Sequence, residues 1–146
     1  MNNGAENARP QGARILIIED DPDSRVSLQE LLQLWGYRVS AAADGADGIK
    51  AALSENPEVI LVDIGIPGPD GYEVARRLTD GGAQPRPVLV ALTGWARDED
   101  RKRGLQAGFD AYLAKPVDAD ELREILEFAL RKGDGVDKPE DDNNKD

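Results

Sequence analysis

The chain has 146 residues, of which 40% are hydrophobic and 32% charged, enough for one globular domain with tails. It carries 29 acidic residues against 18 basic ones, and the net charge of −11 argues against direct binding of nucleic acid. Cysteine and histidine are absent, which excludes a disulfide framework, a zinc site and a histidine-based catalytic triad. No apolar run approaches the ~20 residues that span a bilayer, and the N-terminus lacks the features of a signal peptide. We therefore expect a cytoplasmic protein with no membrane contact.

Both ends of the chain are poor in large apolar residues. Between Gly133 and Asp146 there are six acidic residues and two lysines. Such a segment buries too little surface to offset the entropy lost on ordering. We expect disordered tails over 1–12 and 133–146, and a single folded domain over 13–132.

The folded part alternates between short apolar runs and helical patterns. The predicted strands lie at 15–18, 37–42, 59–63, 88–92 and 111–114. The predicted helices lie at about 23–36, 46–54, 72–81, 98–106 and 118–133. Strict alternation of this kind predicts an α/β fold with a five-stranded, doubly wound parallel sheet, strand order 2-1-3-4-5, and helices on both faces.

Three of the helices carry specific expectations. In 46–54 the apolar stripe is formed by Ile49, Ala52 and Leu53. The helix at 98–106 is charged nearly all round, so we expect weak anchoring through Leu105 and Ala107. The last helix starts with Asp118 as its N-cap and Glu121 three residues later, the spacing of a capping box.

The central strand 59–63 organises the chain. Its four apolar residues predict burial on both faces, and Asp63 is the first charged group after them. Other buried strands also deliver polar side chains at their carboxyl ends, where ligands bind in such sheets. These side chains are Glu19, Asp20, Asp63, Thr93 and Lys115.

This set of groups indicates phosphoryl transfer. Three adjacent carboxylates repel one another, and a hard divalent cation, Mg²⁺ or Mn²⁺, relieves the repulsion. The backbone carbonyl of Gly65 is a further candidate ligand. Asp63 is the candidate nucleophile that forms an acyl phosphate, with Lys115 and Thr93 on the phosphoryl oxygens.

Over residues 13–132 the chain closely resembles the receiver domain of two-component response regulators, a flavodoxin-like fold. Four motifs carry the resemblance, in order and each at a strand end. They are 17–22 (IIEDDP), 62–71 (VDIGIPGPDG), 91–94 (ALTG) and 107–116 (AGFDAYLAKP). The last two are similar to receivers found in hybrid sensor histidine kinases.

The resemblance implies roles for the site residues. Asp63 would take a phosphoryl group from the phosphohistidine of a sensor histidine kinase or a histidine phosphotransfer protein. Asp20 would bind the metal directly, and Glu19 directly or through water. Thr93 would read the phosphate, with Tyr112 as the switch aromatic that packs inward when Thr93 moves. The Lys115–Pro116 peptide bond would be cis.

The resemblance also implies a switch protein, not an enzyme acting on a separate substrate. Phosphorylation would be self-catalysed and would change the surface formed by the fourth helix, the last strand and the last helix, where a downstream protein target binds. Gly65 lacks a side chain to orient a hydrolytic water, and Trp95 is placed to exclude water from the phosphoryl group. We therefore expect slow autodephosphorylation.

Two alternatives stay open at this point. A haloacid-dehalogenase-type phosphatase also uses a strand-end aspartate, but it needs a second aspartate where this chain has Gly65. A phosphate-independent adaptor with a receiver fold usually lacks one of the site residues, and none is missing here. A flavodoxin-like FMN carrier is disfavoured, because the first loop is acidic where a phosphate cradle is required.

Overall fold

A computed structural model describes residues 12–81, 85–94 and 98–133 of the chain. Apart from Gly12 and Gly133, the segments predicted as disordered tails lie outside the described residues. Trp95 lies outside them as well, so its expected role at the site is not tested by the structure.

Strands and helices alternate as predicted. The strands are β1 (Arg14–Ile18), β2 (Arg38–Ala42), β3 (Val59–Asp63), β4 (Val88–Thr93) and β5 (Ala111–Ala114). The helices are α2 (Pro22–Leu34), α3 (Gly45–Glu55), α4 (Gly71–Asp80), α5 (Asp98–Ala107) and α6 (Ala119–Gly133). The strands pair in parallel in the order β2-β1-β3-β4-β5, which confirms the doubly wound fold.

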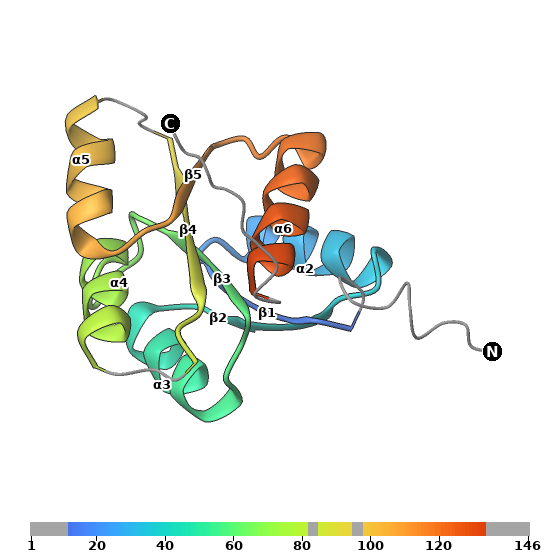
Figure 1. Ribbon diagram of the computed structural model, residues 1–146, viewed down its shortest axis with the longest axis horizontal. Helices are drawn as coiled ribbons and strands as arrows, with labels where there is room; N and C mark the ends of the chain where they lie inside the picture. Colours follow the sequence, from blue (N-terminus) through green and yellow to red (C-terminus); the bar gives the residue numbers. More distant parts are fainter. Residues whose placement is uncertain (1–11, 82–84, 95–97, 134–146) are drawn as a thin grey trace.

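The sheet lies between two layers of helices. Figure 1 shows α2 and α6 on one side of it and α3, α4 and α5 on the other. All five residues of β3 are buried, because both faces of this central strand are covered. Strand β2 is at the edge of the sheet and is mostly only half-buried.

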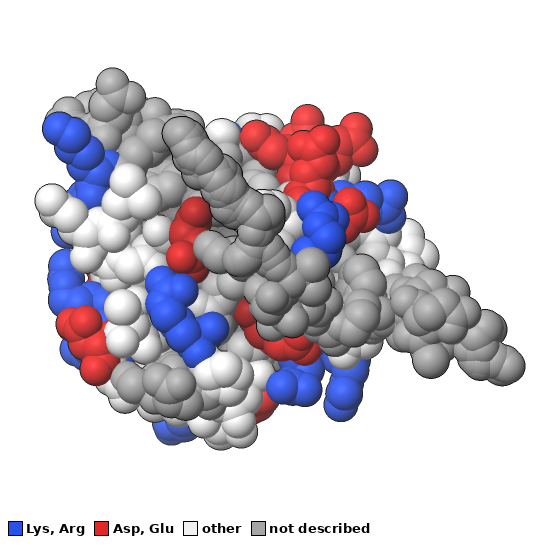
Figure 2. Space-filling view, viewed as in Figure 1, with Lys and Arg blue, Asp and Glu red and all other residues white. Residues whose placement is uncertain are grey.

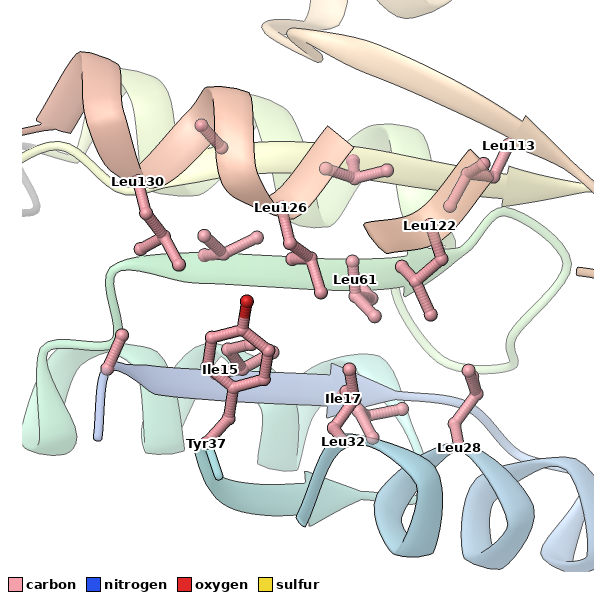
Figure 3. Close-up of a cluster of buried hydrophobic side chains, with 14 of the residues drawn as sticks. Ile15, Ile17, Leu28, Leu32, Tyr37, Leu61, Leu113, Leu122, Leu126 and Leu130 are labelled. Carbon is pink, nitrogen blue, oxygen red and sulfur yellow. The ribbon is translucent and has the colours of Figure 1, made fainter. Parts of the chain in front are cut away.

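The core on the α2 and α6 side is built from leucines of both helices. In Figure 3, Leu122, Leu126 and Leu130 of α6 and Leu28 and Leu32 of α2 converge on the same face of the sheet. Ile17 and Leu61 of the inner strands lie among these leucines. Burying a side chain of this size contributes about 1.5–3 kcal/mol, so this layer fixes the strands whose ends carry the site.

Four helices begin directly after an aspartate whose carboxylate accepts a backbone N–H from the first turn. These N-caps are Asp21 (to Ser24), Asp44 (to Asp47), Asp70 (to Glu73) and Asp118 (to Glu121). Each satisfies a donor that the helix itself leaves unpaired. The predicted N-cap of α6 is confirmed, and four of the 29 acidic residues have this structural role.

Two of the predicted helix contacts are wrong. Leu53 of α3 is 53% exposed and Leu105 of α5 is 67% exposed, so neither is part of the core. Small residues take their place, because α3 and α5 approach the sheet closely. Gly48 and Ala52 are buried in α3, and Gly104 and Ala107 in α5.

On the face shown in Figure 2, basic side chains are seen beside α5, and acidic side chains gather over the start of α6, where Asp120 and Glu121 lie, with basic ones next to them. Within the described ranges, no helix has both the length and the apolar character that crossing a membrane requires.

Candidate phosphoacceptor site

The register of the sheet brings the acidic residues together. Ile18 of β1 pairs with Val62 of β3, so the next residues, Glu19 and Asp63, emerge side by side. Asp20 follows at the same edge. One carboxylate oxygen from each of the three residues lies within 4.8 Å of the others. Glu19 and Asp63 are buried and Asp20 is exposed, so the cluster is open to solvent on the Asp20 side.

Lys115 closes the cluster from β5. Its Nζ donates to Oε1 of Glu19 at 3.0 Å and to Oδ2 of Asp63 at 3.1 Å. The backbone N–H of Lys115 donates to the carbonyl of Thr93 at 2.9 Å, which continues the β4–β5 pairing to the site. The Lys115–Pro116 peptide bond is cis, as the resemblance implied.

Strand alternation separates the site residues onto two sides of the sheet edge. Residues two apart share a face, so Glu19 and Lys115 continue the rows of Ile17 and Leu113, on the side of α2 and α6. By the same rule Thr93 continues the row of Ala91, on the side of α3, α4 and α5. Thr93 therefore approaches the site from the opposite side to Lys115.

Tyr112 lies on the same side as Thr93. It pairs with Ala91 across β4 and β5, and Thr93 pairs with Ala114 two residues further on. Tyr112 is half-buried and packs against the apolar cluster between the sheet and α4. The structure thus brings Glu19, Asp20, Asp63 and Lys115 into one cluster. Thr93 lies at the same edge of the sheet, and Tyr112 lies on the same face as Thr93, on the neighbouring strand.

The electrostatics of the cluster favour a cation. Burial raises the pKa of the Glu19 carboxyl above its ordinary value, and the neighbouring Asp63 carboxylate raises it further. The backbone N–H of Asp21 and the Lys115 ammonium act in the opposite direction without cancelling the effect. Burial works against the charged form of Lys115, but its bonds to Glu19 and Asp63 prevail, so its pKa is raised.

The residues present fit a hard divalent cation. Three carboxyl groups face one ammonium, so the cluster holds more acidic than basic groups. Carboxylate oxygens within a few ångströms of one another are the ligand type that Mg²⁺ prefers. Gly65 is exposed beside the cluster, and its backbone N–H donates to Oδ1 of Asp63 at 3.0 Å.

Two features of the site were not predicted from the sequence. The guanidinium of Arg25 donates to the carbonyl of Glu19 at 3.0 Å and bridges the β1–α2 turn, a contact that no local pattern indicates. A groove of ≈ 240 Å³ opens beside the cluster, between α2 and the residues after β5. Its lining consists of Glu19, Ser24, Ser27, Leu28, Leu31, Leu92, Lys115, Pro116 and Val117.

Comparison with known families decides the identity of the fold. Residues 15–127 match the response regulator receiver domain. The chain belongs to the response regulator receiver family. It is therefore a phosphorylation-activated receiver, and the resemblance seen in its sequence motifs is confirmed.

Curated relatives of this receiver include regulators of two sizes. It is 38% identical over 120 residues to the transcriptional regulatory protein AfsQ1 of Streptomyces coelicolor, covering 82% of this chain and 52% of AfsQ1. It is 36% identical over 119 residues to the protein PilH of Pseudomonas aeruginosa, covering 81% of this chain and 98% of PilH. The receiver thus spans about half the length of AfsQ1 and nearly all of PilH.

Solved receiver structures share the fold. The receiver domain of the sensor histidine kinase PA1611 of P. aeruginosa, with a magnesium ion coordinated in its active-site cleft, has a TM-score of 0.76 and 36% identity. The match covers 82% of this chain and 98% of that one. A CheY-like receiver protein of Methanospirillum hungatei matches with a TM-score of 0.78 and 31% identity, over 85% and 98% of the two chains.

Proposed function

We propose that Asp63 is the phosphoacceptor of this receiver. The observation that carries the proposal is the contact of Lys115 with both Asp63 and Glu19, because it places an ammonium beside a buried carboxylate that also adjoins Asp20. Asp63 ends the central strand of the sheet, held from both sides by β1 and β4. A nucleophile needs this kind of fixed position with charge stabilisation close by.

Glu19, Asp20, Asp63 and the backbone carbonyl of Gly65 would hold a magnesium or manganese ion. Support comes from the close approach of the three carboxyl groups and from their excess over basic groups. When bound, the ion would neutralise the carboxylates and the developing charge on the phosphoryl oxygens. Asp20, as the exposed member, would be the direct ligand, and buried Glu19 would act directly or through water.

The phosphotransfer step uses a carboxylate oxygen of Asp63. This oxygen attacks the phosphorus of a phosphohistidine on the donor protein, a P–O bond forms and the P–N bond breaks. The imidazole of the donor leaves, and Asp63 becomes an acyl phosphate. The Lys115 ammonium would then pair with one phosphoryl oxygen and the Thr93 hydroxyl with another, which draws Thr93 toward the site.

The movement of Thr93 would be passed to Tyr112, which lies on the same side of the sheet. Tyr112 is in β5, between α5 and α6 in the chain, so its movement would alter the face formed by α5, β5 and α6. A downstream protein target would bind to this face, where the charged side chains seen in Figure 2 would help to orient it. The donor would be a sensor histidine kinase or a histidine phosphotransfer protein in the cytoplasm.

The proposal is tested by incubating the protein with acetyl phosphate and Mg²⁺ and measuring its intact mass. Wild type is expected to gain one phosphoryl group, and chelation of the metal with EDTA should abolish the gain. Asp63→Asn should gain none, because an amide is not a nucleophile toward phosphorus. Asp23→Asn is the matched control: it removes an exposed carboxylate in the first turn of α2 and should behave as wild type.

Two outcomes would contradict the proposal. Equal labelling of Asp63→Asn and wild type would exclude Asp63 as the acceptor. A wild type that gains no phosphoryl group from any donor would favour the phosphate-independent adaptor. The phosphatase alternative is set aside, because the chain belongs to the receiver family and has Gly65 where that mechanism needs an acid.

A further inference from the structure

The hydroxyl of Tyr112 occupies the space next to Gly104 of α5 where any other residue would carry its side chain. A Cβ built on Gly104 would overlap the Tyr112 hydroxyl oxygen and lie 2.5 Å from Cζ and 2.6 Å from Cε1 of the ring. Real Cβ atoms do not approach other atoms this closely, so an alanine at 104 requires the tyrosine to move.

In the part of α5 whose side chains the structure describes, small residues face the sheet. Among residues 102–107, Gly104 and Ala107 are buried and the other four are exposed. Beneath these two small residues lies a row of aromatic rings: Tyr72 contacts Phe109 edge to face with centroids 6.4 Å apart, and Phe109 contacts Tyr112 at 6.2 Å. The Arg103 guanidinium lies 4.1 Å from the Tyr72 ring centroid and joins α5 to the other end of this row.

We propose that Gly104 is a positioning residue that holds the Tyr112 ring against α5 before any phosphorylation. The missing side chain at 104 provides the space, and the Phe109 ring supports the tyrosine from the side. The Tyr112 hydroxyl contacts the backbone of α5 at Gly104. A movement of Tyr112 therefore changes the distance between α5 and the sheet. This inference builds on the proposed switch role of Tyr112, but the contact itself involves no phosphoryl group.

Gly104→Ala is the direct test. Alanine in a helix interior normally stabilises relative to glycine, and Gly104 has no positive φ that would penalise a side chain. We nevertheless expect Gly104→Ala to lower Tm, since Tyr112 must leave its place. In a Tyr112→Leu background, which removes the hydroxyl and the ring, the same substitution should raise Tm. A purely local effect of glycine on α5 would give the same sign in both backgrounds.

Nitration by tetranitromethane measures the accessibility of each tyrosine ring, and it can detect a displaced Tyr112 even if Tm does not change. The chain has three tyrosines, and Tyr37 and Tyr72 are 7% and 5% exposed. We expect nitration of Tyr112, located by peptide mass mapping, to be several-fold faster in Gly104→Ala than in wild type. Leu105→Ala is the matched control, because it shortens an exposed side chain of the same helix and leaves position 104 unchanged.

Both measurements are made without phosphorylation, so this inference and the phosphoacceptor assignment can fail separately. A Tm that rises on Gly104→Ala in both backgrounds, with Tyr112 nitration unchanged, would overturn the role of Gly104. A reversal of the sign of the Tm shift between the two backgrounds, with faster nitration of Tyr112, would establish it.

Discussion

Glu19 is a fully buried carboxylate next to Asp20, which is exposed. Its oxygens accept from the Lys115 ammonium at 3.0 Å and from the Asp21 backbone N–H at 3.1 Å, and its pKa is still raised by burial and by Asp63. In the metal-free protein, the surroundings of Glu19 therefore disfavour its ionised form overall. The charge of Glu19 therefore lowers the stability of the fold, and the residue serves the phosphoacceptor site instead.

This leads to a prediction for Glu19→Gln in the absence of divalent metal. The pKa of Glu19 is higher in the folded protein than its ordinary value of 4.5, so the folded state favours the protonated carboxyl. The stability that this group contributes is therefore fully present below pH 4.5 and is lost as the pH rises through the folded-state pKa. Glutamine does not titrate. The variant should therefore have a higher Tm than wild type at neutral pH, and the difference should shrink toward pH 4.5, as thermal melts in EDTA would show.

Adding Mg²⁺ should narrow the gap at neutral pH, because wild type gains stability from ligand binding while the variant has lost a carboxylate. Glu55→Gln is the matched control, because it removes a carboxylate far from the site. Glu55 is exposed and accepts a hydrogen bond from the Ser40 hydroxyl at 2.6 Å. A Glu19→Gln variant that is less stable than wild type in EDTA at pH 7 would show that the ion pair with Lys115 outweighs the cost of burial.

Gly65 lies beside Asp63 and has room for a side chain. A Cβ there would lie 3.8 Å from Oδ1 of Asp63, an ordinary contact, and Gly65 has no positive φ, so a side chain can be accommodated beside the acyl phosphate. We predict that Gly65→Asn hydrolyses its acyl phosphate about tenfold faster than wild type, because an amide can orient the attacking water. The decay of the phosphorylated mass after removal of acetyl phosphate measures the rate.

Gly65→Ala is the matched control, since it adds bulk without a polar group. The comparison between asparagine and alanine isolates the positioning of water from simple crowding. Equal lifetimes for the two variants would mean that position 65 does not control hydrolysis.

At the scale of the elements, the strands and the helix starts are predictable from the sequence. Four-residue apolar runs such as 59–62 have no polar face to expose, so only a central parallel strand suits them. Asp118 with Glu121 predicts the start of α6 because the capping geometry is local.

The helix faces are less predictable because glycine and alanine contribute little to a hydrophobic pattern. In α3 and α5 the helix packs through small residues, and the large apolar side chains Leu53 and Leu105 are exposed instead. The pattern therefore adds Leu53 and Leu105, which lie outside the core, to Ile49, Ala52 and Ala107, which do pack in it as predicted. The close approach of Gly104 to Tyr112 has no local signal either, since it depends on where β5 lies relative to α5.

At the scale of the whole molecule, the site residues are predictable as a set because parallel strands end at one edge of the sheet. Glu19 and Lys115 are 96 residues apart in sequence and 3.0 Å apart between their charged groups. The motifs identify which residues end the strands, and the strand order identifies which of those are neighbours. The groove beside α2 was not predictable, since its lining joins residues from three separate segments whose relative positions only the folded chain defines.

The central claim is that this edge of the sheet makes Asp63 the phosphoacceptor, and chemical location of the phosphoryl group tests it most directly. Borohydride reduces an acyl phosphate to the alcohol, so a phosphorylated aspartate becomes homoserine and is found by peptide mass mapping. After treatment with acetyl phosphate and Mg²⁺, followed by reduction, we predict homoserine at position 63 alone, and none when EDTA is present. Homoserine at Asp20 or at any other aspartate, with Asp63 unmodified, would contradict this account of the site.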